Sequence, residues 1–300
     1  MAHNNEHPLF PFFLLALVFF VLTAPIAAQQ VPLAEKEALK NFYQETAGGS
    51  WTHNWDLQAN VASWHGVTVK NGHVTQLVLH NNGLKGKLSE HLAQLGHLEV
   101  LNLAFNELHG TIPKDLFQLP RLRVVQLEMN KLKGTLPNDF SQCNSLRKLV
   151  LFNNKLEGGI PNGIGDATQL RVLNLSSNYL SGSLPQGLAK LKHLEQLEVF
   201  GNKFSGQIEV DFSQLENLRE VIISHNGFEG ALPDGLLTLE KLQLVHVQGN
   251  NFSSLGTWAM SPSAGIAVFE SDDTLLNFQL NELRQGRTRM ATNSFEEDKN

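Results

Sequence analysis

The chain has 300 residues, 42% of them hydrophobic and 17% charged, and its formal net charge is −6. Nucleic acids and anionic membranes need a basic partner surface, so this balance argues against both classes of partner. The length is sufficient for one or two domains with a large hydrophobic core.

The N-terminal segment has the pattern of an export signal. Residues 9–22, LFPFFLLALVFFVL, form an unbroken apolar run, and the small residues Ala27 and Ala28 follow. This predicts a secretory signal peptide over residues 1–28, cleaved after Ala28, and no stable membrane span after cleavage. A secreted, periplasmic or cell-surface location would follow. The alternative is an uncleaved membrane anchor, because residues 9–28 are just long enough to span a bilayer.

Residues 29–73 are predicted to form an N-terminal cap made of a helix and a hairpin. The segment EKEALKNFYQET, residues 35–46, places its apolar side chains on one helical face. Further on, Asn71-Gly72 separates two alternating segments, which is typical of a two-residue hairpin turn. Three tryptophans of this segment are predicted to cover the end of the core: Trp51, Trp55 and Trp64.

Residues 74–254 repeat with a period of 24 residues. In each repeat two apolar residues alternate with variable ones, an Asn follows three residues later, and in most repeats a Gly stands four residues beyond it. The alternation predicts a short strand with one face in the core. The Asn amide both donates and accepts, so it can satisfy backbone groups where the chain leaves the strand. The predicted ladder consists of Asn82, Asn106, Asn130, Asn154, Asn178, Asn202, Asn226 and Asn250.

This pattern resembles the leucine-rich repeat family in its 24-residue plant-type form. The resemblance implies an extracellular α/β repeat solenoid: a curved horseshoe with a parallel concave sheet, eight repeats and a cap at each end. The segment WHGVTV also resembles the plant-type N-terminal cap, but Val69 stands where that cap usually has a cysteine. The cap therefore lacks the usual disulfide, and apolar packing has to replace it.

Residues 255–300 are predicted to form a C-terminal cap and a solvated tail. After Asn250 the repeat pattern stops, and Ser254 replaces the expected Gly. Scattered apolar residues, Trp258 among them, suggest a short strand and a helix. Asp272 and Asp273 are expected to begin that helix or, alternatively, to contact a partner.

The sequence shows no pattern of an active site or a metal centre. Cys143, the single cysteine, aligns with core leucines, which predicts a buried inert thiol. Of the twelve histidines, those near the cap match no ligand spacing, so we expect neither a metal nor a cofactor. No nucleophile motif is present, and a non-enzymatic protein is predicted; an unrecognised site in the C-terminal cap is the alternative. The histidines considered were His65, His73, His80, His97 and His193.

The residues that do not repeat are the candidates for a binding site, since repeated residues belong to the scaffold. Alternate residues of each predicted strand face outward on the concave side. Phe152 and Phe200 share one outward column with Ser176 between them, so two rings flank a shallow gap of a kind that anchors protein contacts. The predicted ligand-binding residues are Phe152, Phe200, Val150, Ile222, Glu128, Lys148, Glu198, Ser176 and His246, with Glu220 also at the rim.

These observations predict an exported, non-catalytic recognition module that binds a protein or peptide ligand on its concave face. The alternative is a carbohydrate-binding or adhesive cell-surface protein, in which the aromatic rings would stack on sugars. The sequons at Asn174 and Asn251 predict glycosylation in a eukaryotic secretory route only. The sequence identifies neither the ligand nor the source.

Overall fold

The computed structural model describes residues 30–254, 268–270 and 272. The predicted signal peptide, Trp258, Asp273 and most of the predicted C-terminal cap and tail lie outside these residues. Within the described part of the chain, no helix combines the length and the apolar character needed to cross a membrane.

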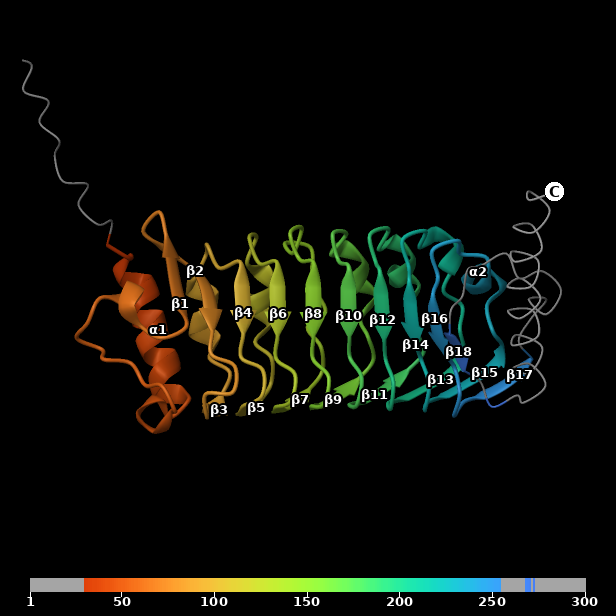
Figure 1. The fold of residues 1–300 in the computed structure, drawn as a ribbon, viewed down its shortest axis with the longest axis horizontal. Helices are drawn as coiled ribbons and strands as arrows, with labels where there is room; N and C mark the ends of the chain where they lie inside the picture. The colour runs from red at the N-terminus through yellow and green to blue at the C-terminus, as the bar shows by residue number, and fades with distance from the viewer. Residues whose placement is uncertain (1–29, 255–267, 271, 273–300) are drawn as a thin grey trace, which may run out of the picture.

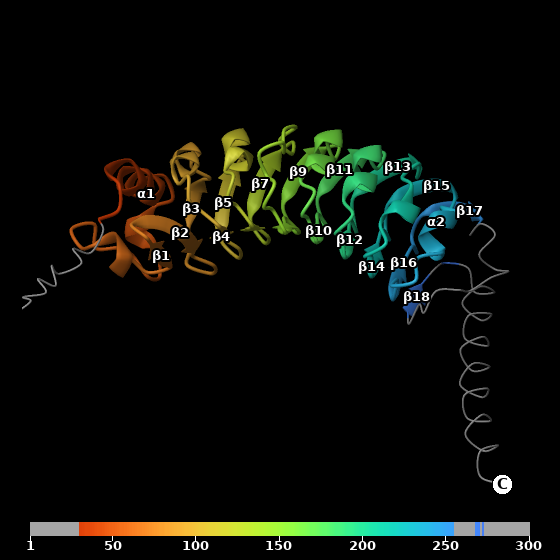
Figure 2. The same cartoon turned by 90° about the horizontal axis from the view of Figure 1, so that it is seen from above.

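The repeats stack into an arc whose inner side is lined by a ten-stranded sheet (Figures 1 and 2). The first pair of strands is antiparallel, and the following strands are parallel, with equivalent residues paired at the 24-residue spacing. In order across the sheet, the strands are β1 (Val67–Lys70), β2 (His73–Val78), β4 (Val100–Asn102), β6 (Val124–Gln126), β8 (Lys148–Val150), β10 (Val172–Asn174), β12 (Gln196–Glu198), β14 (Glu220–Ile222), β16 (Leu244–His246) and β18 (Val268–Glu270).

A second sheet of eight short strands runs along the solenoid beside the first. In each repeat, the strand of the second sheet follows the strand of the inner sheet. In most repeats a short outer helix comes next, and the chain then returns to the inner sheet. Its strands are β3 (Lys85–Lys87), β5 (Glu107–Gly110), β7 (Lys131–Gly134), β9 (Lys155–Gly158), β11 (Tyr179–Gly182), β13 (Lys203–Gln207), β15 (Gly227–Ala231) and β17 (Asn251–Ser254). The outer helices are η3 (Glu90–Gln94), η4 (Lys114–Gln118), η5 (Asn162–Asp166), η6 (Gln186–Lys190), η7 (Phe212–Gln214) and α2 (Asp234–Leu237).

The core between the sheets and the outer helices is built from the repeated leucines. Leu101 and Leu103 are fully buried, as are their equivalents in successive repeats. A single repeat cannot cover its own apolar face, so each repeat is stabilised by its two neighbours. The curved parallel solenoid that the family resemblance implies is confirmed.

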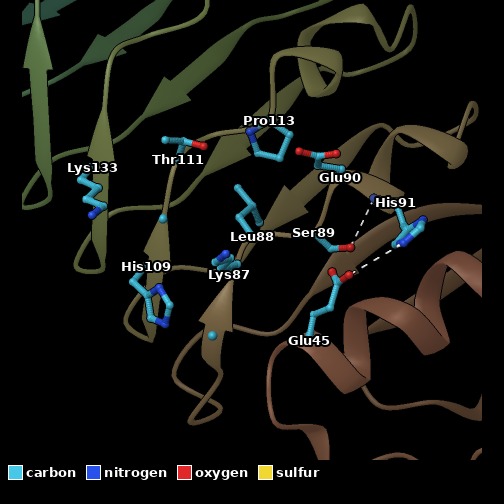
Figure 3. A pocket seen from close by; sticks show the side chains of 12 residues that line it. Glu45, Lys87, Leu88, Ser89, Glu90, His91, His109, Thr111, Pro113 and Lys133 are labelled. Carbon is cyan, nitrogen blue, oxygen red and sulfur yellow. Dashed lines mark hydrogen bonds and ion pairs between the residues drawn. The ribbon is translucent and has the colours of Figure 1, made fainter.

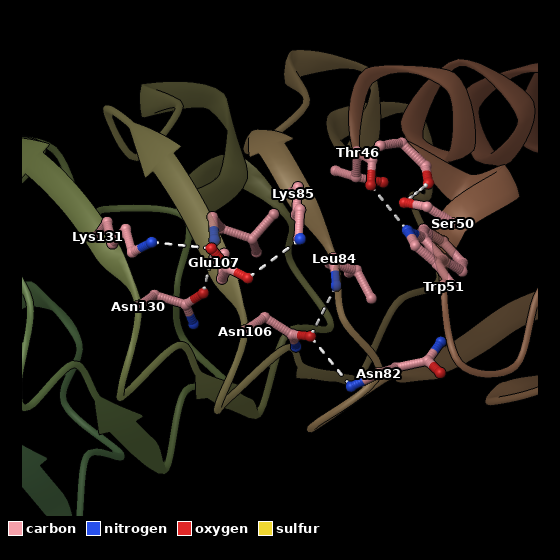
Figure 4. A network of polar contacts seen from close by, with 12 residues as sticks. Thr46, Ser50, Trp51, Asn82, Leu84, Lys85, Asn106, Glu107, Asn130 and Lys131 are labelled. Carbon is pink, nitrogen blue, oxygen red and sulfur yellow. Dashed lines mark hydrogen bonds and ion pairs between the residues drawn. The ribbon is translucent and has the colours of Figure 1, made fainter.

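The asparagines at the strand exits join adjacent repeats through backbone hydrogen bonds. The Asn154 amide donates to the carbonyls of Leu151 and Leu127, each at 3.0 Å, and its oxygen accepts from the Leu132 N–H at 3.0 Å. At the N-terminal end, the Asn106 oxygen accepts from the N–H groups of both Leu84 and Asn82 (Figure 4). One side chain thus satisfies backbone groups in two successive repeats.

The N-terminal cap consists of α1 (Leu33–Glu45), the short helices η1 (Gly48–Ser50) and η2 (Val61–Ser63), and the β1–β2 hairpin. The hairpin turn has positive φ at both Asn71 and Gly72, as its sequence predicts. Val69, in the position of the missing cysteine, packs against the core. Three buried indoles seal the end of the solenoid, and each donates to a backbone carbonyl: Trp51, Trp55 and Trp64.

At the C-terminal end, the sheet continues beyond the predicted repeats. β18 pairs in parallel with β16, and Val268 lies opposite Leu244 at the same 24-residue spacing. The two strands are therefore offset by the length of one repeat. Asp272 follows β18 at a bend, where its carboxylate accepts from the Gly249 N–H at 2.6 Å.

Candidate ligand-binding face

The inner face presents side chains at the outward positions of each strand and at the turn that follows. Equivalent positions of successive repeats form columns along this face. We call two of these columns the third column, which lies just after the strand, and the turn column. The third column is His80, Ala104, Glu128, Phe152, Ser176, Phe200, Ser224 and Gln248. The turn column, one residue further along, is Asn81, Phe105, Met129, Asn153, Ser177, Gly201, His225 and Gly249.

The turn column carries two apolar side chains that the alternation of strand residues does not reveal. Phe105 is 49% exposed and Met129 is 37% exposed. Both have positive φ, 57° and 56°, an uncommon conformation for residues other than Gly. The available signal in the sequence was an apolar residue immediately before a ladder Asn, where the other six repeats have a polar residue or Gly.

Phe105, Met129 and Phe152 come from three successive repeats and lie on the same face of the solenoid. Phe152, in the third column, is half-buried rather than freely exposed. Within the described residues, five large apolar side chains are classed as exposed, and three of them belong to this face. Such a concentration of exposed apolar groups is typical of an interaction site.

Two repeats beyond Phe152, the ring of Phe200 is 39% exposed and contacts the His225 ring edge-on, with centroids 5.3 Å apart. Ser176 lies between Phe152 and Phe200 in the third column. The Ser176 side chain is buried, and its hydroxyl oxygen has no hydrogen-bond partner within the described residues. A buried hydroxyl of this kind is stabilised when a ligand supplies the missing bond.

Glu128 is the least satisfied charged side chain of this face. It was predicted at an exposed rim, but it is only 6% exposed. One carboxylate oxygen accepts from the Gln126 amide at 3.2 Å, while the other is buried without a partner in the described structure. An unpaired buried carboxylate oxygen is unfavourable, so a donor that reaches it would be bound favourably.

The remaining predicted site residues occupy less accessible positions. Val150 is buried, so it does not belong to an exposed patch. In a concave parallel sheet, the side chains of adjacent strands about 4.8 Å apart crowd one another, which explains its burial. Lys148, Ile222 and His246 are half-buried.

The C-terminal half of the face is acidic. The Glu198 carboxylate accepts from the Asn174 amide at 2.7 Å, and Glu220 accepts from the Gln196 amide at 3.0 Å. Burial raises the pKa of Glu198 above its ordinary value, and the nearby charge of Glu220 raises that pKa further, while Lys148 lowers it. This region is therefore suited to a cationic or hydrogen-bond-donating group.

A separate cleft of about 790 Å³ lies between the cap and the second sheet. Figure 3 shows Lys87, His109 and Lys133 at one side and the Glu45–His91 pair at the other, with 3.8 Å between His91 Nε2 and a carboxylate oxygen of Glu45. Its lining combines two lysines and two histidines with the carboxylates of Glu45 and Glu90 and with neutral residues.

Cys143 is fully buried, and its thiol donates to the Phe117 carbonyl at 2.9 Å. Burial raises the thiol pKa to about 12, with a smaller contribution from Asp139. The reactive thiolate is therefore scarce at neutral pH.

The comparisons with known proteins agree with this architecture. The family described as a leucine-rich repeat region matches residues 85–280. No curated protein matches the chain.

Several solved structures are similar. The PEPR1–AtPEP1 complex has 26% identity and a TM-score of 0.68, covering 73% of this chain and 32% of that one. The plant peptide hormone receptor RGFR1 with RGF2 has 26% identity and a TM-score of 0.55, covering 58% and 32%. The ectodomain of GASSHO1/SCHENGEN3 from Arabidopsis thaliana, with CASPARIAN STRIP INTEGRITY FACTOR 2, has 25% identity and a TM-score of 0.52, covering 73% and 33%. The chain spans about a third of the length of these structures.

Proposed function

The chain belongs to the leucine-rich repeat family, and from this premise we propose that it is an exported, non-catalytic recognition protein that binds a peptide or protein segment along its inner face. The similar structures include receptors in complex with their partners, one of which is a peptide hormone receptor. The named partners are ligands of those receptors and are not assigned to this chain. The similarity supports a peptide as the class of ligand for this chain.

One observation carries the proposal: exposed apolar side chains and unpaired buried oxygens lie on the same face. Phe105, Met129 and Phe200 supply apolar contacts, while one carboxylate oxygen of Glu128 and the hydroxyl oxygen of Ser176 have no hydrogen-bond partner within the described residues. An extended peptide combines apolar side chains with a row of backbone N–H groups, so it matches both features. Aromatic anchors that become desolvated can each contribute about 2 kcal/mol or more to binding.

The size of the face also fits a short peptide. Phe105 follows β4 and Phe200 follows β12, and these strands are four positions apart in the sheet. At about 4.8 Å per strand, the separation is roughly 19 Å, the length of about six extended residues. The acidic Glu198–Glu220 region at the C-terminal end would favour a basic residue at that end of the peptide.

The proposal is tested by affinity capture of a partner from the native medium, in parallel with a glycan array. We expect a peptide or protein to be captured and the array to be negative. Specific retention of a glycan, with no protein partner, would instead support the carbohydrate-binding alternative. Catalytic assays on the whole chain are expected to show no turnover of the captured partner.

A further inference from the structure

Three potential ligands for a metal ion meet where the cap joins the first repeats. Glu35 lies in the first turn of α1, His73 begins β2, and His97 precedes β4. One ligand atom from each of them lies within 4.8 Å of the others. Because the three residues come from separate elements, their spacing in the sequence gives no metal motif, and the sequence predicts no metal.

The contacts among the three side chains are close. His73 Nδ1 is 2.6 Å from one oxygen of Glu35, and the rings of His73 and His97 are stacked with their centroids 3.7 Å apart. The other Glu35 oxygen accepts from the Val74 N–H at 2.8 Å. Glu35 is buried and anchored, whereas both imidazoles are half-buried and accessible from solvent.

The chemistry of these donors selects a class of ion. Two imidazoles and one carboxylate suit Zn²⁺ and neighbouring divalent transition metals, not Ca²⁺ or Mg²⁺, which prefer oxygen ligands. Ligands about 2.1 Å from a tetrahedral Zn²⁺ lie about 3.4 Å from one another. Binding would require the two stacked rings to turn so that a nitrogen of each points toward the ion, and the 2.6 Å contact between His73 and Glu35 to lengthen.

One nearby charge acts against binding. The Arg121 guanidinium interacts electrostatically with His97, and its positive charge repels a cation, which limits the affinity of the site.

We propose that Glu35, His73 and His97 bind one divalent transition-metal ion, with Zn²⁺ as the representative ligand. The ion would connect the cap helix to the first two repeats, so occupancy would stabilise the N-terminal end of the solenoid. The fourth coordination position would be left to solvent.

The test is titration calorimetry of the purified, untagged protein with a zinc salt, supported by thermal melts with and without zinc. We expect binding of one Zn²⁺ per chain and a higher melting temperature. His97→Gln should weaken binding at least tenfold, and Glu35→Gln provides a second variant. The matched control is His193→Gln, because His193 occupies the same position of a later repeat and is exposed.

Melts without zinc establish that each variant is folded before its affinity is interpreted. Absence of saturable binding at millimolar zinc would overturn the proposal. An equal loss in His193→Gln, or full affinity in a folded His97→Gln, would overturn it as well. His65→Gln reports on the other stacked pair, His53 and His65, whose rings are 4.4 Å apart; a loss confined to that variant would place the ion there and contradict our assignment.

Discussion

The two sheets of the solenoid are built from the same repeats, yet their exposed residues differ. On the second sheet, several exposed side chains are partnered: Glu107 lies 3.4 Å from Lys85 and 2.9 Å from Lys131 (Figure 4), and the Lys203 ammonium lies 5.1 Å from the Tyr179 ring centroid. On the inner sheet, apolar groups are exposed and buried oxygens are unpaired. The repeat therefore fixes the scaffold of both sheets, whereas, among the described residues, the unpaired buried oxygens of Glu128 and Ser176 lie on the inner face, where a ligand would complete them.

The largest expected effect comes from disrupting the scaffold that both sheets share. Asn154→Ala removes the partners of three backbone groups, at roughly 1–3 kcal/mol for each unpaired group. We expect a loss of at least about 3 kcal/mol in the free energy of unfolding, measured by denaturant melts. Asn250 is half-buried, so water can replace its bonds and Asn250→Ala should be milder. Equal losses would show that position along the stack is unimportant.

The next largest effect is expected for a variant of the inner face in which stability and partner affinity should change in opposite directions. Glu128→Met removes the unpaired buried oxygen while keeping a side chain of similar length. We expect the free energy of unfolding to rise by about 1 kcal/mol and binding of a captured partner to weaken. Denaturant melts and titration calorimetry measure the two effects. A destabilised variant with unchanged affinity would remove Glu128 from the proposed site.

A smaller, pH-dependent effect is expected at Glu198. Its folded-state pKa is raised, so the stability associated with protonation is fully present below the unfolded-state pKa, about 4.3, and is lost as pH rises through the raised value. Glu198→Gln should therefore have a higher melting temperature than the parent at pH 7, and the difference should vanish near pH 4. A lower melting temperature for Glu198→Gln than for the parent at pH 7 would show that the folded structure stabilises the ionised carboxylate of Glu198.

The smallest effect is expected on the second sheet. Glu107→Gln removes the charge between Lys85 and Lys131, but all three side chains are exposed and their interactions are screened by solvent and salt. We expect the melting temperature and partner affinity to remain within experimental error of the parent. A weakened affinity would move the binding surface, or part of it, to the second sheet.

The 24-residue period was sufficient to predict the solenoid, the strands and the buried leucines, because each repeat imposes the same burial on the same positions. It was not sufficient for the inner face. Phe105 and Met129 were missed, since they occupy a left-handed turn that strand alternation does not describe. Val150 and Glu128 were predicted to be exposed but are buried, because crowding depends on neighbours 24 residues away. Likewise, the proposed metal ligands come together only after the cap folds onto the first repeats.

The central claim, that the inner face binds the partner, is tested most directly by titration calorimetry of three alanine variants with a captured partner. Phe105→Ala and Phe200→Ala should each raise the Kd at least tenfold, about 1.4 kcal/mol, with little change in melting temperature. Tyr179→Ala, which removes an aromatic ring that is 52% exposed on the second sheet, should leave the Kd unchanged. Parental affinity in both phenylalanine variants, or a loss confined to Tyr179→Ala, would contradict the account.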